Sequence, residues 1–188
     1  RGWLGLATVV VAAALPTGAA PRGITVAAAS DLQLAFTELG AAFRKETGVP
    51  VTFTFGSSGT LARQVENGAP VDLYAAANEE FVAQLEAKGR TVAGTRRVYA
   101  VGMLVLARYR GSGTEIGTLR EVRRAGIRHV AMANPEHAPY GAAARQALQR
   151  AGVWEALRPK LVIGESVRHA LQFVQTGNAE CGLVARSV

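Results

Sequence analysis

Cysteine and histidine, two residue types that often hold transition metals, are scarce in this sequence of 188 residues. The single cysteine, Cys181, excludes an intrachain disulfide and an all-cysteine zinc site. The three histidines, His129, His137 and His169, show no spacing typical of metal ligands. We therefore expect Cys181 to be a small buried apolar residue, the histidines not to be metal ligands, and the protein to need no cofactor.

Sequence motifs of common catalytic sites are also absent. There is no phosphate-binding P-loop and no G-x-G-x-x-G, and the run Gly-Ser-Ser-Gly at 56–59 differs from G-x-S-x-G. His137 lies in a loop bounded by prolines and has no evident orienting partner. The adjacent carboxylates Glu79 and Glu80 would point in different directions on a helix. The sequence therefore predicts that the protein is not an enzyme.

The positive charge is spread along the chain. The formal net charge is +7, and the densest basic cluster has no aromatic residues between its members: Arg120, Arg123, Arg124 and Arg128. A nucleic-acid surface needs clustered cations, so we interpret these residues as a solvated basic face and expect no nucleic-acid partner.

The first twenty residues have the pattern of a secretory signal peptide. Arg1 precedes an apolar stretch over residues 3–15, and the small residues Ala19 and Ala20 follow Pro16. This apolar stretch is shorter than the ~20 residues that a transmembrane helix needs. We predict a signal peptide over residues 1–20 and a periplasmic or otherwise exported protein.

The rest of the chain alternates between strand-like and helix-like segments, which predicts an α/β fold with largely parallel sheets. Strands are expected over residues 24–29, 51–55, 71–77, 99–107, 129–133, 160–163 and 179–185. Helices are expected between residues 30 and 48, and over 60–67, 79–88, 119–125, 141–151 and 166–176. We place a first lobe at residues 21–98 and a second lobe at residues 99–188.

Two serines stand where a strand ends and a helix begins. Ser30 follows the first predicted strand as a candidate N-cap, and Ser58 lies at the corresponding junction after the second. Similar junctions in the second lobe lie near Tyr140 and Val167. A helix N-terminus presents unpaired N–H groups and partial positive charge, so four such junctions around one cleft would bind an anion without Lys or Arg.

Around these residues the sequence resembles the periplasmic molybdate-binding proteins of ABC importers. The similarity extends over nearly all of the chain after the predicted signal peptide. The matching stretches are Ile24-Thr-Val-Ala-Ala-Ala-Ser30, Phe55-Gly-Ser-Ser-Gly-Thr-Leu-Ala-Arg-Gln64, Gly68-Ala-Pro-Val-Asp-Leu73, Asn134-Pro-Glu-His-Ala-Pro-Tyr-Gly141, Gly164-Glu-Ser-Val-Arg168 and Gly177-Asn-Ala-Glu-Cys-Gly-Leu-Val184.

This resemblance implies a two-lobed periplasmic binding protein fold of type II, in which the chain crosses twice between the lobes. It implies that Ser30 and Ser58 bind molybdate or tungstate through hydroxyl and main-chain N–H groups. Tyr140 and Val167 would contribute main-chain N–H groups, and the metal would be held as its oxyanion rather than as a bare ion. The implied partner is an ABC transporter permease, and the protein is expected to be a monomer.

Two departures from the family pattern accompany the resemblance. Some members carry a tyrosine hydroxyl at the position of Ala185, which this chain lacks. The family fold also returns to the first lobe after the strand that ends near Val188, so we expect the C-terminal part of the first lobe to be missing from this chain and some apolar surface to be uncovered.

Two alternatives remain open at this point. A site made only of donors would reject hydrogen phosphate, whose proton would find no acceptor, while rejection of sulfate would depend on cavity size. A carboxylate that reaches into the cleft, such as Asp31 or Glu165, would instead favour a protonated ligand and a binding protein for another small anion, such as sulfate or phosphate. A sensory domain of similar fold is the other alternative, which the predicted signal peptide disfavours.

Overall fold

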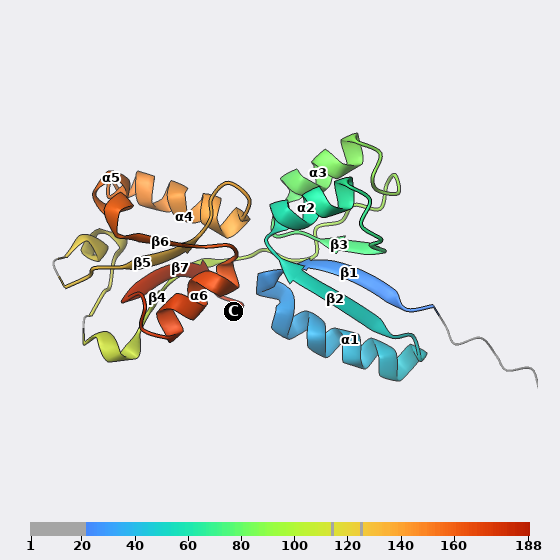
Figure 1. Ribbon diagram of the computed structural model, residues 1–188, viewed down its shortest axis with the longest axis horizontal. Helices are drawn as coiled ribbons and strands as arrows, with labels where there is room; N and C mark the ends of the chain where they lie inside the picture. Colours follow the sequence, from blue (N-terminus) through green and yellow to red (C-terminus); the bar gives the residue numbers. More distant parts are fainter. Residues whose placement is uncertain (1–21, 114, 125) are drawn as a thin grey trace, which may run out of the picture.

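The computed structural model describes residues 22–113, 115–124 and 126–188, so the predicted signal peptide lies outside the described residues. These residues form two groups of strands and helices that lie next to one another (Figure 1). The predicted boundary between residues 98 and 99 falls in the irregular segment that joins them. No helix in the described part is long and apolar enough to span a membrane.

A parallel sheet with the strand order β2-β1-β3 forms the centre of the first lobe. Its strands are β1 (Ile24–Ala29), β2 (Val51–Gly56) and β3 (Leu73–Ala75). The helix α1 (Gln33–Thr47) lies on one side of this sheet, and α2 (Ser58–Glu66) and α3 (Glu79–Ala87) lie on the other (Figure 1). Gly48 ends α1 with a positive φ of 74°, a backbone conformation that glycine adopts without a steric penalty.

A mixed sheet with the strand order β4-β7-β5-β6 forms the centre of the second lobe. Its strands are β4 (Leu104–Arg108), β5 (Val130–Ala133), β6 (Leu161–Gly164) and β7 (Cys181–Ala185). The helices are α4 (Pro139–Arg150), α5 (Trp154–Leu157) and α6 (Val167–Gln175), with short 3-10 helices at Arg110–Ser112, Leu119–Arg123 and Arg158–Lys160.

Two features of the elements differ from the sequence-based expectations. The strand expected from Tyr99 begins only at Leu104, because residues 99–103 form the exposed passage between the lobes. The expectation of largely parallel sheets agrees with the structure, in which β4 is the strand that pairs antiparallel, with β7. The short helix α5 was not expected, because four residues are too few to show a 3.6-residue period.

The better-packed core lies in the second lobe. Met132, Leu148 and Leu183 are fully buried there, and Cys181 belongs to the same cluster, as expected of a buried apolar thiol. The first lobe buries a smaller set around Val26. Several of its large apolar side chains are exposed, among them Leu34, Leu39, Phe43 and Leu73.

The starts of the helices near the lobe boundary position the candidate site. The carboxyl ends of three strands lead into helices near this boundary. β1 leads into the 3-10 helix Ser30–Leu32, β2 leads into α2, and β6 leads into α6. These ends of the two sheets face one another across the lobe boundary (Figure 1). Ligands bind at such edges in open α/β sheets.

Candidate functional site

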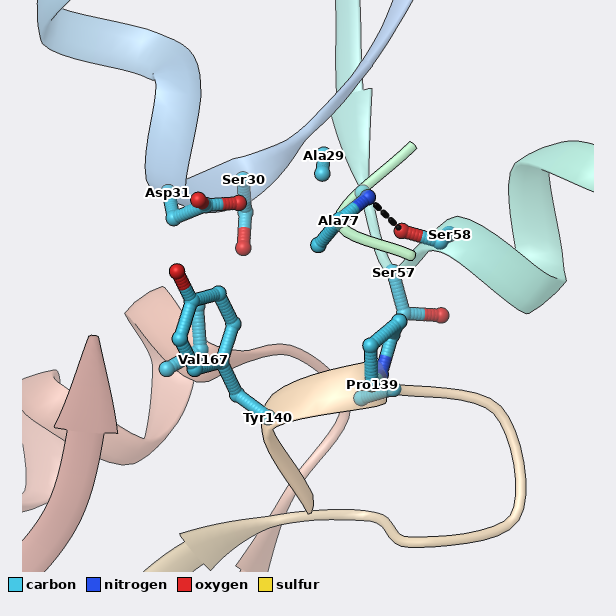
Figure 2. Close-up of a pocket in the computed structure, with 11 residues that line it drawn as sticks. Ala29, Ser30, Asp31, Ser57, Ser58, Ala77, Pro139, Tyr140 and Val167 are labelled. Atoms are coloured by element: carbon cyan, nitrogen blue, oxygen red, sulfur yellow. Dashed lines mark hydrogen bonds between the residues drawn. The ribbon is translucent and has the colours of Figure 1, made fainter. Parts of the chain in front are cut away.

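One cavity between the lobes brings the four predicted residues together. Ser30 and Ser58 line it from the first lobe, and Tyr140 and Val167 line it from the second (Figure 2). The cavity holds about 180 Å³ of empty space, part of it open to solvent. The remaining lining residues are Ala29, Asp31, Gly56, Ser57, Ala77, Ala138 and Pro139.

Ser30 differs in its local role from the sequence-based prediction. It is the first residue of a 3-10 helix, and Ala29 holds the N-cap position without a side-chain cap. The prediction that Ser30 is an N-cap is therefore wrong, because the chain tightens into a 3-10 turn directly after β1. As a result the Ser30 hydroxyl is not used for capping, and it points toward the second lobe (Figure 2).

Ser58 is the first residue of α2, where the preceding Ser57 is the N-cap and accepts a hydrogen bond from the Thr60 N–H. The Ser58 side chain is buried, and its Oγ accepts a hydrogen bond of 3.0 Å from the main-chain N–H of Ala77 (Figure 2). A hydroxyl that accepts one bond can still donate its own proton. Ala77 therefore orients Ser58 as a donor toward the cavity.

The second lobe contributes two helix starts. Tyr140 follows Pro139 at the beginning of α4, and Pro139 has no N–H to leave unpaired at that position. Val167 is the first residue of α6, and the Ser166 side chain caps that helix by accepting from the His169 N–H. The N–H groups of a first helical turn have no partner within the helix, so those of Tyr140 and Val167 remain available to a ligand.

The cavity is not lined by donors alone, in contrast to the site that the sequence led us to expect. Asp31 lines it and is only 8% exposed, and its Oδ1 atom has no hydrogen-bond partner in the described part of the chain. The other candidate carboxylate, Glu165, lies outside the lining with its side chain 81% exposed. Neither Lys nor Arg is among the described lining residues.

Burial changes the proton affinity of the groups around Asp31. It raises the pKa of Asp31, an effect that hydrogen bonds from the Asp31 backbone and from the Tyr140 hydroxyl partly offset. Burial also raises the pKa of Tyr140 to about 12, and the nearby charge of Asp31 adds to this rise. The Tyr140 hydroxyl is therefore a proton donor at neutral pH, and it lies on the opposite side of the lobe boundary from Asp31 (Figure 2).

His137 connects the two lobes beside the cavity, which corrects the expectation that it has no orienting partner. Its Nδ1 atom lies 2.8 Å from the Ser57 Oγ atom, and its Nε2 atom lies 3.4 Å from a carboxylate oxygen of Glu165. Its carbonyl oxygen accepts a hydrogen bond of 2.8 Å from the Gly59 N–H. The Nδ1 contact with Ser57 is thus a hydrogen bond between the lobes, and the tautomer of the imidazole ring sets its direction. We call these contacts of His137 with Ser57 and Gly59 the inter-lobe latch.

Removal of the His137 side chain is expected to weaken ligand retention. The change His137→Ala deletes the side-chain bond across the lobes but keeps the bond from Gly59 to the carbonyl. One such bond contributes about 0.5–1.5 kcal/mol, so we expect dissociation of the ligand to accelerate about three- to tenfold. Stopped-flow measurement of the dissociation rate tests this.

The matched control for this change is His129→Ala. His129 also lies near a glutamate, Glu180, but it does not line the cavity. An equal acceleration in both variants, or none in His137→Ala, would contradict the assigned role of the latch.

Two features of the site were missed by the sequence-based prediction: the contact of the Tyr140 hydroxyl with Asp31, and the hydrogen bond from the Ala77 N–H to Ser58. Only the main chain of Tyr140 was expected to matter, whereas its hydroxyl faces Asp31 across the lobes. Ala77 follows β3 and carries no polar side chain, so no sequence signal marks its N–H as the partner of Ser58. Ala185, where some relatives were expected to carry a tyrosine, is buried at the end of β7 in the same apolar cluster as Tyr140.

Comparison with known proteins places the chain among binding proteins for small solutes. The model of the family described as bacterial extracellular solute-binding protein matches residues 24–188. The chain is 42% identical over 165 residues to the molybdate-binding protein ModA of Azotobacter vinelandii, covering 87% of this chain and 65% of the relative. It is 39% identical over 178 residues to ModA of Rhodobacter capsulatus, covering 95% of this chain and 69% of the relative. The chain thus spans about two thirds of the length of these relatives.

The solved structures agree with this placement. The periplasmic molybdate-binding protein of Azotobacter vinelandii superposes with a TM-score of 0.80 at 33% identity, covering 86% of this chain and 71% of that one. The sulfate-binding protein SubI of Mycobacterium tuberculosis superposes with a TM-score of 0.72 at 19% identity, covering 88% of this chain and 65% of that one, which shows a shared fold alone. The expected two-lobed α/β fold of periplasmic binding proteins is confirmed by these likenesses.

Proposed function

Because this chain belongs to the bacterial extracellular solute-binding protein family, we propose that it captures molybdate or tungstate outside the cytoplasm and delivers it to an ABC importer. The observation that carries the proposal is the cavity between the lobes. It gathers the Ser30 and Ser58 hydroxyls and the N-terminal turns of α2, α4 and α6, with neither Lys nor Arg among its described lining residues. The names of the relatives from Azotobacter vinelandii and Rhodobacter capsulatus point to molybdate as the ligand.

The chemistry of this site suits an oxyanion that has lost all its protons. Hydroxyl and main-chain N–H groups can replace the water around each oxyanion oxygen, and the helix N-termini add partial positive charge. Since each of these groups is held in place within its own lobe, binding requires closure of the lobes but little reorganisation inside either of them. We propose that Ser30, Ser58, Tyr140 and Val167 provide the donors that hold the ligand.

The other parts of the proposal concern how the protein works in the cell. We propose that it is an exported monomer that needs no cofactor, carries out no catalysis and presents its closed, loaded form to a transporter permease. The family membership supports export and a transport role. The contacts of His137 with Ser57 and Gly59 support closure of the lobes as the event that encloses the ligand.

Isothermal titration calorimetry of the full-length protein with molybdate, tungstate, sulfate and phosphate tests the proposed function. We expect molybdate and tungstate to bind with similar dissociation constants below about 1 µM, and sulfate and phosphate to bind at least about 100-fold more weakly. Phosphate carries a proton at neutral pH that would find no acceptor among hydroxyl and N–H donors, and weak binding of sulfate would show that the cavity discriminates by size. Equal affinity for sulfate and molybdate would end the claim of selectivity, and an absence of molybdate binding would overturn the function.

A further inference from the structure

Asp31 is a buried acid within a site proposed for a doubly negative ligand. Asp31 lines the cavity next to Ser30, is only 8% exposed, and its Oδ1 atom has no hydrogen-bond partner in the described part of the protein. Buried polar atoms normally have a partner, because an unpaired one costs free energy. An unpaired carboxyl oxygen at the wall of a binding cavity therefore indicates a contact that the ligand completes.

The side chains that face Asp31 carry no positive charge. The helix α4 presents the Tyr140 hydroxyl, and the passage between the lobes presents Tyr99, whose pKa is raised to about 12 by burial and by the charge of Asp31. The helix α6 presents Val167, and its titratable residues Arg168 and His169 lie outside the cavity lining. Each facing group is thus neutral at physiological pH.

An ionised Asp31 and an oxyanion would repel one another strongly in this setting. Both charges would be removed from water, and like charges at short range disfavour the ionised form of the acid. A neutral carboxylic acid removes the repulsion and adds an O–H group, which can donate to an oxyanion oxygen as Ser30 and Ser58 do. Burial already raises the pKa of Asp31 before any anion is present.

We propose that Asp31 binds the oxyanion as a neutral carboxylic acid, so that each captured ligand is accompanied by the uptake of one proton. The proton passes from solvent to a carboxylate oxygen of Asp31, the resulting O–H donates to the ligand, and no bond within the oxyanion forms or breaks. Asp31 is then a specificity-determining residue for fully deprotonated oxyanions. This inference rests on the proposed function, because it assumes a ligand that brings no proton of its own.

The direction of the pH dependence follows from the order of the two Asp31 pKa values. The bound oxyanion raises the pKa of Asp31 above its value in the free protein. At a pH between the pKa of the free protein and that of the complex, the complex therefore holds more protons than the free protein. In that interval the affinity rises as the pH falls, by tenfold per pH unit for one linked proton. Above the pKa of the complex the affinity is low and constant.

Calorimetric titration of the full-length protein with sodium molybdate, from about pH 6 to about pH 8.5, tests the proposal. At each pH the titration is repeated in buffers of different ionisation enthalpy, and the slope of the observed enthalpy against that enthalpy counts the protons taken up. The wild type is expected to take up close to one proton per ligand and to lose affinity as the pH rises. The isosteric variant Asp31→Asn is expected to take up none and to bind with a pH-independent affinity that exceeds that of the wild type at the highest pH.

The control variant Glu38→Gln removes one negative charge from the exposed surface of α1 and is expected to keep the proton uptake and the pH slope. Proton uptake near zero in the wild type would overturn the proposal about Asp31, and so would an unchanged dependence of affinity on pH in Asp31→Asn. In either case, binding of molybdate would still support the proposed function. Failure of the wild type to bind molybdate at any pH would overturn both. Sodium phosphate serves as the second probe: if it binds more tightly than molybdate and Asp31→Asn abolishes that binding, Asp31 acts as an ionised acceptor and the proposal is wrong.

Discussion

Simultaneous replacement of Ser30 and Ser58 by alanine is expected to weaken molybdate binding by at least about 100-fold. Each hydroxyl would donate to a charged oxygen, and a hydrogen bond to a charged group contributes about 1.5–3 kcal/mol. Two of them correspond to about 3–6 kcal/mol, or two to four powers of ten in the dissociation constant. Calorimetry of the double variant measures this directly.

The double variant needs a control for stability, because Ser58→Ala also leaves the partly buried N–H of Ala77 without its partner. That loss costs about 1–3 kcal/mol of folding free energy, so thermal unfolding should be followed alongside binding. The control change Thr47→Ala with Thr176→Ala also removes two hydroxyls, and both of these make their hydrogen bonds near helix ends outside the cavity. If the serine variant folds and retains wild-type affinity, the ligand binds elsewhere.

The change Gly59→Ala is expected to prevent closure of the lobes and to reduce the apparent affinity by about 100-fold. A Cβ atom at this position would lie 2.7 Å from a ring carbon of Phe81 and 2.8 Å from the carbonyl oxygen of His137. Phe81 belongs to the first lobe and His137 to the second, so the methyl group would separate them. The apparent dissociation constant rises in inverse proportion to the fraction of molecules that can close, and about 1% closure gives the stated loss.

Closure and binding can be measured separately for Gly59→Ala. Small-angle X-ray scattering with saturating molybdate is expected to show a larger radius of gyration than for the wild type, and calorimetry to show the loss of affinity. The control Gly117→Ala places a methyl group whose nearest neighbour is a Glu121 side-chain oxygen at 3.5 Å, which is an ordinary contact. A Gly59→Ala protein that closes and binds as the wild type does would show that the inter-lobe latch does not govern capture.

The two largest predictions depend on different physical terms. The serine variant tests the donors that contact the ligand, whereas the glycine variant tests the approach of the two lobes. A protein that binds through one lobe alone would be sensitive to the first change and insensitive to the second. Sensitivity to both is the behaviour expected of a ligand enclosed between Ser58 on one side and Tyr140 on the other.

The sequence alone determined the α/β alternation and the position of most elements, because these depend on local signals. Hydrophobic periodicity placed the strands of the first lobe, and Gly48, Gly68 and Gly89 marked the ends of its helices, where the structure finds positive φ values. The junctions between strands and helices near the four site residues could also be located from the sequence. The assignment of Ser30, Ser58, Tyr140 and Val167 as oxyanion donors came from the resemblance to molybdate-binding proteins.

The tertiary structure decided which side chains of distant segments meet. Asp31 and Tyr140 are more than a hundred positions apart, and so are Glu165 and Ser57, which His137 connects. The hydrophobic periodicity within each lobe does not predict how the two lobes face one another, because that arrangement arises from packing across their boundary. For the same reason the sequence could predict a site for anions, but only the folded chain shows that a buried acid shares the cavity with the donors.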